Sequence, residues 1–165
     1  MSIKLIANVD MNNGIGDEEG NLLFDIKKDK EFFKNVTSGK TVVMGRVTWE
    51  SLPDAHRPLK KRKNYIMTND INYKSEGAKL LHSVEEVVEL AKSRDVYIIG
   101  GEKIYEQFID LAVELILTHV HSNSPFAYTF FPDFEPKDWA LQKMTKHEAD
   151  EDCKFSFTFA NYKRK

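Results

Sequence analysis

The pattern of apolar and polar positions predicts a strand, a loop and a helix at the start of the chain. Residues 3–9 are mostly apolar, which is typical of a buried strand. Residues 26–37 place apolar side chains at helical spacing among lysines, which predicts an amphipathic helix with one buried face. Between them, residues 10–25 hold three glycines and three asparagines. We expect a long functional loop there rather than a regular element.

The remaining pattern predicts an α/β fold. Ser83 and Glu86 form a capping box that opens a helix to about residue 92, and a second helix is expected from 102 to about 111. Strands are expected at 41–44, 64–68, 78–81, 95–99, 113–121, 138–147 and 154–162. Strand–helix–strand order favours a parallel sheet with helices on both faces, and the late strands favour an antiparallel hairpin. We expect one domain over residues 1–165, with a mixed, mostly parallel central sheet flanked by helices and an antiparallel C-terminal hairpin.

Composition and charge exclude several classes of protein. The chain has 24 Lys and Arg against 26 Asp and Glu, a formal net charge of −2, whereas proteins of nucleic acids or anionic membranes favour basic domains. Cys153 is the only cysteine, which excludes a disulfide scaffold and a four-cysteine zinc site and favours a reducing compartment. No apolar run approaches the roughly 20 residues of a membrane helix, and the N-terminus lacks a signal-peptide core. We expect a cytoplasmic protein without nucleic-acid or membrane partners.

Two glycine junctions are candidates for phosphate binding. Gly100 and Gly101 lie between a predicted strand and a helix, where bare backbone and free helix N–H groups attract phosphate. Gly45 and Arg46 occupy a similar junction, in which the arginine suits a doubly charged phosphate. Ordinary turns use the same residues, so each junction alone leaves both interpretations open. Neither junction is a G-x-G-x-x-G or Walker A motif.

A third candidate is Asp29, which lies four residues before Phe33 on the predicted helix. This spacing puts a carboxylate beside an aromatic ring on one helix face. If that face lines a pocket, burial would raise the carboxyl pKa and prepare Asp29 for acid–base work. If the face is exposed, Asp29 is a solvated residue between two lysines.

The order of the motifs resembles dihydrofolate reductase over essentially the full length. The motifs are Ile6-Ala7, Gly14-Ile15-Gly16, Gly20-Asn21-Leu22, Asp29 with Phe33-Lys34 and Thr37, MGRVTWESL (44–52), IIGGEKIYEQF (98–108), LTHV (117–120) and FFPDF (130–134). The resemblance implies NADPH-dependent reduction of 7,8-dihydrofolate to 5,6,7,8-tetrahydrofolate, in support of one-carbon and thymidylate metabolism. It also implies a central mixed sheet of eight strands. We expect a monomer whose partner is the small-molecule substrate dihydrofolate.

The resemblance further implies a substrate pocket. The pterin would contact Ile6, Ala7, Asp29, Phe33, Ile99 and Thr118, and the benzoyl group would contact Leu52 and Leu59. Asp29 would accept two hydrogen bonds from the 2-amino and N3 edge of the pterin while Thr118 holds it in place, with Leu22 as a further catalytic residue. Arg62 would pair with the α-carboxylate of the glutamyl tail, which suits the planar guanidinium, and Arg57 would assist it.

A cofactor site follows from the same resemblance. It would comprise Asn8, Gly14, Ile15, Gly16, Gly20, Arg46, Val47, Thr48, Thr68, Asn69, His82, Gly100, Gly101, Glu102, Lys103, Ile104, Tyr105 and Gln107. The NADPH pyrophosphate would lie on the helix starts after Gly45 and Gly101. We expect no metal, because His119 and His121 share a strand face without an evident third ligand.

Several positions depart from the family pattern, among them His82, which stands where a lysine or arginine is common. Leu23-Phe24 stands where relatives usually have Pro-Trp, which removes an indole donor near the pterin and leaves the loop less restrained. Lys30 follows Asp29 where an apolar residue is more usual. One alternative is a reductase of similar fold acting on a ribosylamino-pyrimidine, which the Asp29–Phe33 pair and Arg62 speak against. The other is a non-catalytic pteridine or nucleotide binder, which the altered Leu23-Phe24 segment leaves possible.

Overall fold

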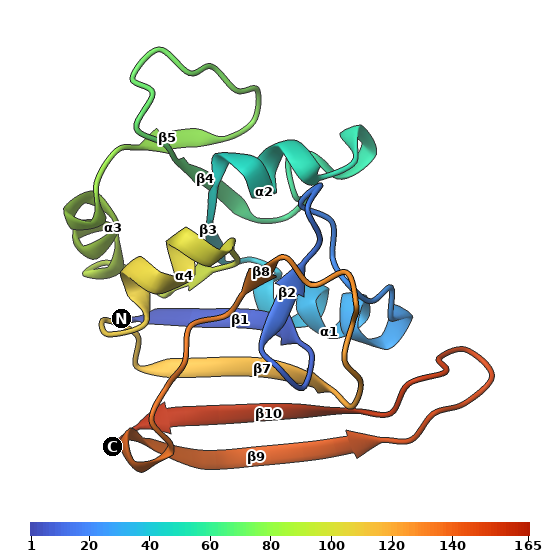
Figure 1. Cartoon of the computed structure of the whole chain (residues 1–165). Helices are drawn as coiled ribbons and strands as arrows, with labels where there is room; N and C mark the ends of the chain where they lie inside the picture. Colours follow the sequence, from blue (N-terminus) through green and yellow to red (C-terminus); the bar gives the residue numbers. More distant parts are fainter.

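Eight strands form one central sheet in the computed structural model, which describes all residues 1–165 (Figure 1). They are β1 (Ile3–Val9), β3 (Thr41–Gly45), β4 (Lys63–Met67), β5 (Lys79–Leu81), β6 (Val96–Ile98), β7 (Glu114–Val120), β9 (Trp139–His147) and β10 (Phe157–Arg164). Their order across the sheet is β5-β4-β3-β6-β1-β7-β10-β9. Neighbours from β5 to β7 are parallel, and β10 runs antiparallel to both β7 and β9. The predicted fold class and the eight strands are confirmed.

Helices cover both faces of this sheet because side chains alternate between the faces along each strand. The helices are α1 (Lys27–Thr37), α2 (Arg46–Ser51), α3 (Val84–Ala91) and α4 (Glu102–Phe108), with short 3₁₀ turns at Asp54–His56 and Pro136–Asp138. On β1, Leu5 belongs to a core cluster that includes residues of α3 and α4, among them Phe108. The next residue, Ile6, belongs to a cluster formed with α1 and α2, among them Trp49. None of these helices is long and apolar enough to cross a bilayer.

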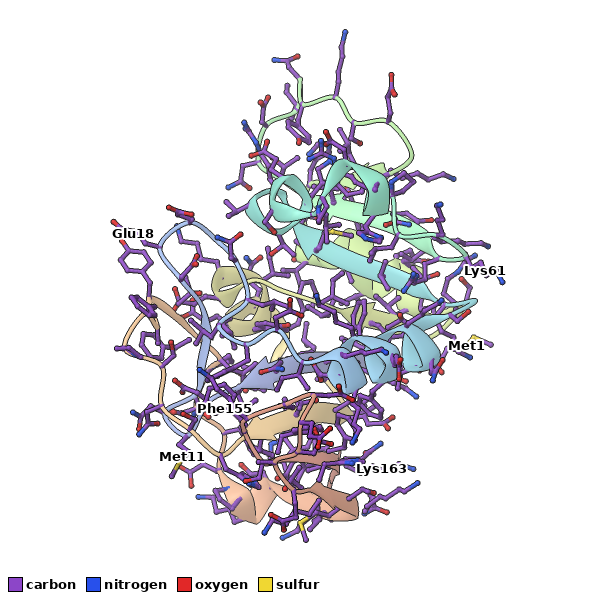
Figure 2. All side chains as sticks on the ribbon, turned by 90° about the vertical axis from the view of Figure 1, so that its right-hand side faces the viewer. Met1, Met11, Glu18, Lys61, Phe155 and Lys163 are labelled. Atoms are coloured by element: carbon purple, nitrogen blue, oxygen red, sulfur yellow. The ribbon has the colours of Figure 1, made fainter.

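The loop prediction for residues 10–25 needs one correction. Within it, β2 (Gly14–Gly16) pairs antiparallel with β8 (Thr129–Phe130), a strand the sequence pattern did not predict. The buried Asp10 carboxylate explains the pairing, because it accepts hydrogen bonds from the backbone N–H groups of Asn12, Gly14 and Ser124. One acidic side chain thereby joins two distant segments of the chain. Glu18 marks the outer end of the loop in Figure 2, on the opposite side of the molecule from Lys61.

The C-terminal strand starts later than predicted. β10 begins at Phe157 rather than near residue 154. Before it, the ring of Phe155 packs edge-on against Phe24, with the ring centroids 5.0 Å apart. Phe24 is buried in a small cluster with Val120 and Phe157. The end of the 10–25 loop is therefore anchored to the C-terminal hairpin.

Candidate active site

Asp29 projects from the first turn of α1 onto two neighbouring strands of the sheet. Asn8 of β1 and Thr118 of β7 are partners in the parallel register, so they lie side by side at one level of the sheet. The Thr118 hydroxyl donates to Asp29 Oδ1 at 2.6 Å, and the Asn8 amide donates to Asp29 Oδ2 at 2.9 Å. Each carboxylate oxygen thus has one donor from a different strand.

Burial dominates the electrostatics of this carboxyl group. Asp29 is only 9% exposed, and this desolvation raises its pKa above the ordinary value for aspartate, against the opposing effects of its two hydrogen bonds and of Lys30. The Lys30 ammonium itself pairs with the exposed Asp25 at 2.6 Å. From α4, the buried Tyr105 hydroxyl donates to the Ile6 carbonyl at 2.7 Å. Burial and the nearby Asp29 raise the pKa of Tyr105, so this hydroxyl stays neutral.

Apolar side chains form a cluster on the face of the sheet that carries Asn8 and Thr118, the partners of Asp29. Five residues predicted for the substrate pocket belong to this cluster or pack against it: Ile6, Phe33, Leu52, Leu59 and Ile99. Ile6 lies on β1 and Phe33 on α1, whereas Leu52 and Leu59 follow α2 and Ile99 follows β6. Ala7 is placed differently, because strand alternation turns its side chain toward the core on the α3 and α4 side.

The two arginines predicted for the substrate tail have different hydrogen-bond and ion-pair partners. The Arg62 guanidinium donates to Thr37 Oγ1 at 3.2 Å and to the Lys60 carbonyl at 2.9 Å, and it lies 5.9 Å from the centroid of the Phe33 ring. It is thus fixed beside the apolar cluster. The Arg57 guanidinium forms an ion pair with Asp54 at 2.8 Å, and it lies 5.8 Å from the centroid of the Trp49 ring in the same cluster.

The two glycine junctions meet at the starts of α2 and α4. The Gly45 N–H donates to the Gly100 carbonyl at 2.8 Å, which holds the two helix starts together. An added Cβ at Gly45 would lie 2.9 Å from the Ile104 side chain, and one at Gly101 would lie 3.4 Å from the Thr48 hydroxyl. Only glycine leaves bare backbone at this approach. The N–H groups that open a helix precede its hydrogen-bond ladder, and in α4 the Ile104 N–H is the first to find an acceptor, the Gly101 carbonyl. The two helix starts therefore fit a bound pyrophosphate.

Arg46 follows one of these junctions and is surrounded by acidic side chains. Its Nε lies 2.8 Å from Glu50 Oε1, and its Nη1 lies 3.8 Å from Asp70 Oδ2. The ion pair with Glu50 raises the pKa of Arg46 and lowers that of Glu50. Thr68 Oγ1 accepts from the Asp70 N–H at 3.1 Å, and the Thr68 carbonyl lies 2.8 Å from His82 Nδ1. Asp70 therefore links Arg46 to Thr68, and Thr68 in turn contacts His82.

The sequence model of the family described as "Dihydrofolate reductase" matches residues 2–164 of this chain. The chain belongs to the dihydrofolate reductase family. It is 30% identical over 165 residues to a dihydrofolate reductase of Staphylococcus aureus, covering 100% of this chain and 99% of that protein. It is 29% identical over 164 residues to that of Bacillus subtilis, covering 99% and 95%.

A solved member of the family has the same fold. The structure of dihydrofolate reductase from Enterococcus faecalis, complexed with NADP(H) and RAB-propyl, superposes with a TM-score of 0.91 at 29% sequence identity. The match covers 99% of this chain and 96% of that chain. The family resemblance first seen in the motifs is thereby confirmed.

Some features of the site were not predicted from the family resemblance. Asn8 was assigned to the cofactor, but its side chain binds Asp29. Leu22, expected near the catalytic centre, is 61% exposed. The partners of Arg46 were also missed, although Glu50 lies four residues after Arg46 on one helix, a spacing that commonly forms ion pairs. For Asn8, the available signal was the register of two parallel strands, which no local motif reports.

Proposed function

We propose that this chain reduces 7,8-dihydrofolate to 5,6,7,8-tetrahydrofolate with NADPH. The observation that carries the proposal is one buried carboxylate, Asp29, set in an apolar wall with a hydrogen-bond donor fixed on each oxygen. NADPH, when bound, supplies a hydride from nicotinamide C4 to pterin C6, and pterin N5 takes up a proton. The hard chemistry belongs to the reductant, so the chain contributes positioning and electrostatics.

The two oxygens and the negative charge of the Asp29 carboxylate suit the donor edge of the pterin. Each carboxylate oxygen has about two acceptor sites, and Thr118 and Asn8 use one on each oxygen. One site per oxygen is left for the 2-amino and N3 donors of the pterin edge. The carboxylate charge polarises the ring and favours its protonated form. Asp29 is buried and would face the 2-amino and N3 edge of the pterin rather than N5, so we assign the delivery of the proton to a water admitted by residues 10–25.

The rest of the substrate extends along the apolar cluster toward Arg62. Leu52 and Leu59 would contact the benzoyl group, and both pack against the cluster around Ile6. Arg62 would pair with the α-carboxylate of the tail. Its present acceptors, Thr37 Oγ1 and the Lys60 carbonyl, are neutral, so its charge is available to an anion.

The backbone at two glycine junctions and the side chain of Arg46 are the groups of this chain that fit the phosphates of NADPH. The paired junctions at Gly45 and Gly101 would hold the pyrophosphate, and Arg46 with Thr68 and His82 would hold the ribose 2′-phosphate. A phosphate would displace Glu50 from Arg46, because the arginine is exposed and the ion pair is open to solvent. The other residues predicted for the cofactor site stay part of this proposal.

We infer that residues 1–165 form one domain, because one sheet takes strands from both ends of the chain (Figure 1). We also infer that the chain is a monomer and that it lies in the cytoplasm, the reducing compartment that the lone cysteine favours. Light scattering of the purified protein tests the monomer, and a dimer mass would contradict it.

The decisive assay follows absorbance at 340 nm with NADPH and dihydrofolate. We expect NADPH to be consumed only when dihydrofolate is present, with tetrahydrofolate as product. A ribosylamino-pyrimidine substrate is the control for the alternative reductase. Turnover of the pyrimidine without turnover of dihydrofolate would assign the chain to that reaction. Binding of dihydrofolate without turnover would assign it to a non-catalytic binder.

A further inference from the structure

Asn8 donates a hydrogen bond to one oxygen of the pocket carboxylate, and no role in the reaction has yet been assigned to this contact. Its Nδ2 lies 2.9 Å from Asp29 Oδ2, while Thr118 Oγ1 lies 2.6 Å from Asp29 Oδ1. Asn8 and Thr118 are register partners on β1 and β7, whereas Asp29 comes from α1. Three elements therefore converge on one carboxyl group, and two of them contribute side-chain donors.

Removing either donor would change the orientation of the carboxylate plane. A carboxylate held at one oxygen rotates about its χ2 angle, which is a soft torsion. A second donor on the other oxygen fixes that rotation. Fixed orientation matters here, because recognition of the pterin edge needs both oxygens to face the ligand at once.

We propose that Asn8 is a positioning residue for the reaction, which holds Asp29 as a correctly oriented carboxylate for the pterin edge rather than binding the cofactor with its side chain. This inference rests on the proposed function of Asp29. It changes the role that the family resemblance implied for Asn8.

The other titratable groups near Asp29 are bound elsewhere, so they do not orient its carboxylate in place of Asn8. On α1, Lys30 lies next to Asp29 in sequence, but its ammonium is bound to Asp25 at 2.6 Å. From α4, the Tyr105 hydroxyl is neutral and donates to the Ile6 carbonyl. No salt bridge reaches Asp29. The groups that favour the charged form of Asp29 are therefore chiefly the two neutral donors, Asn8 and Thr118, with a smaller coulombic effect of Lys30.

The first test titrates the Asp29 carboxyl directly, by carbon-13 NMR of the ligand-free protein. In Asn8→Ala the carboxylate loses a donor, so the titration midpoint should move upward by about one pH unit. Asn35→Ala is the matched control, because Asn35 is exposed and lies on α1, the helix that carries Asp29. It should leave the midpoint unchanged. An Asp29 midpoint that is equal in Asn8→Ala and Asn35→Ala would overturn the proposal.

A second variant keeps the test open if Asn8→Ala does not fold. Asn8→Asp preserves the shape of the side chain but replaces the amide donor by an acceptor. The two facing carboxyl groups should then share one proton, and the pair should show a raised midpoint above that of Asp29 in the wild type. Two carboxyl groups that both titrate in the ordinary range would contradict the contact.

Kinetics separate positioning from cofactor binding. In Asn8→Ala, kcat/KM for dihydrofolate should fall about tenfold, while the dissociation constant for NADPH stays within about twofold of wild type. A loss of NADPH affinity with an unchanged Asp29 titration would show that Asn8 serves the cofactor instead. Failure of the proposed function is distinguishable, since the wild type would then not reduce dihydrofolate whatever the NMR titration shows.

Discussion

Asp29 and Arg46 are the two charged side chains on which the proposed reaction depends, and the fold holds them in opposite ways. Asp29 is buried and has two neutral donors from neighbouring strands. The Arg46 side chain is 48% exposed and has two carboxylates, Glu50 and Asp70, from its own helix and a nearby loop. The Asp29 carboxylate is buried and has no charged partner, whereas the Arg46 guanidinium is exposed to solvent and already paired with carboxylates.

The difference indicates how each site would bind its ligand. A buried carboxylate is costly to the folded state, so its environment has to be shaped in advance and the ligand completes its hydrogen bonds. An exposed ion pair contributes little, so an incoming phosphate exchanges with Glu50 at small cost. We therefore expect substitutions at Asp29 to affect catalysis and substitutions at Arg46 to affect affinity.

The largest effect is expected for Asp29→Asn. This change keeps the shape of the side chain but removes the anionic partner of the pterin, so turnover at pH 7 should fall by about 10²–10⁴-fold. Activity should recover in part at low pH, where substrate is protonated in solution. Steady-state rates across pH test this, with the exposed Asp110→Asn as control. Near-wild-type turnover at pH 7 would remove Asp29 from the mechanism.

The next effect concerns Arg46→Leu, which should weaken NADPH binding by roughly ten- to hundredfold. NADH lacks the 2′-phosphate, so its affinity should be nearly unchanged. Fluorescence titration with both cofactors measures the difference, and NADH serves as the internal control. Equal losses for the two cofactors would show that Arg46 does not bind the phosphate.

Glu50→Gln sharpens the same contrast. If Glu50 competes with the phosphate for Arg46, its neutralisation should strengthen NADPH binding by about two- to fivefold and leave NADH unaffected. The titration used for Arg46→Leu measures this change. Weaker NADPH binding would instead mean that Glu50 orients the arginine. The contrast between a preformed Asp29 site and an exchangeable Arg46 ion pair would then be wrong.

The smallest effect is a gain in stability. Burial raises the folded-state pKa of Asp29 above that of the unfolded chain, so the folded protein binds more protons between these two values. Stability therefore falls as pH rises through that interval. Asparagine does not titrate, so Asp29→Asn should be more stable than wild type at pH 7, and the advantage should shrink toward the ordinary aspartate pKa. Urea unfolding at pH 4 and pH 7 measures it, and an advantage that grows on acidification would contradict the sign.

Local patterns were enough to predict the central sheet and the helices. The apolar run on β1, the Ser83 cap of α3 and the glycine junctions are encoded in short stretches of sequence. The structure bears out the cap, since the Ser83 side chain accepts from the Glu86 N–H. The β2 and β8 pair was missed because Asp10 and Ser124, which join these segments, lie far apart in the chain.

The site was less predictable for the same reason. Family motifs named Asp29 and Thr118, but the Asn8 contact depends on which residue of β1 faces Thr118 across the sheet. Ala7 lies one position away and therefore points to the other face. The Tyr73 hydroxyl contacts Glu50 at 3.1 Å from a loop that carries no motif. Such contacts follow from register and loop path, which single-sequence patterns do not contain.

The most direct test of the account is a crystal structure of this chain with folate and NADP⁺. It would measure the distances from Asp29 Oδ1 and Oδ2 to the 2-amino nitrogen and N3 of the pterin. We predict both distances in the hydrogen-bond range of about 2.7–3.2 Å, with Thr118 and Asn8 still bound to Asp29. A pterin edge that lies beyond hydrogen-bond distance of Asp29, with its polar groups bound elsewhere, would contradict the account.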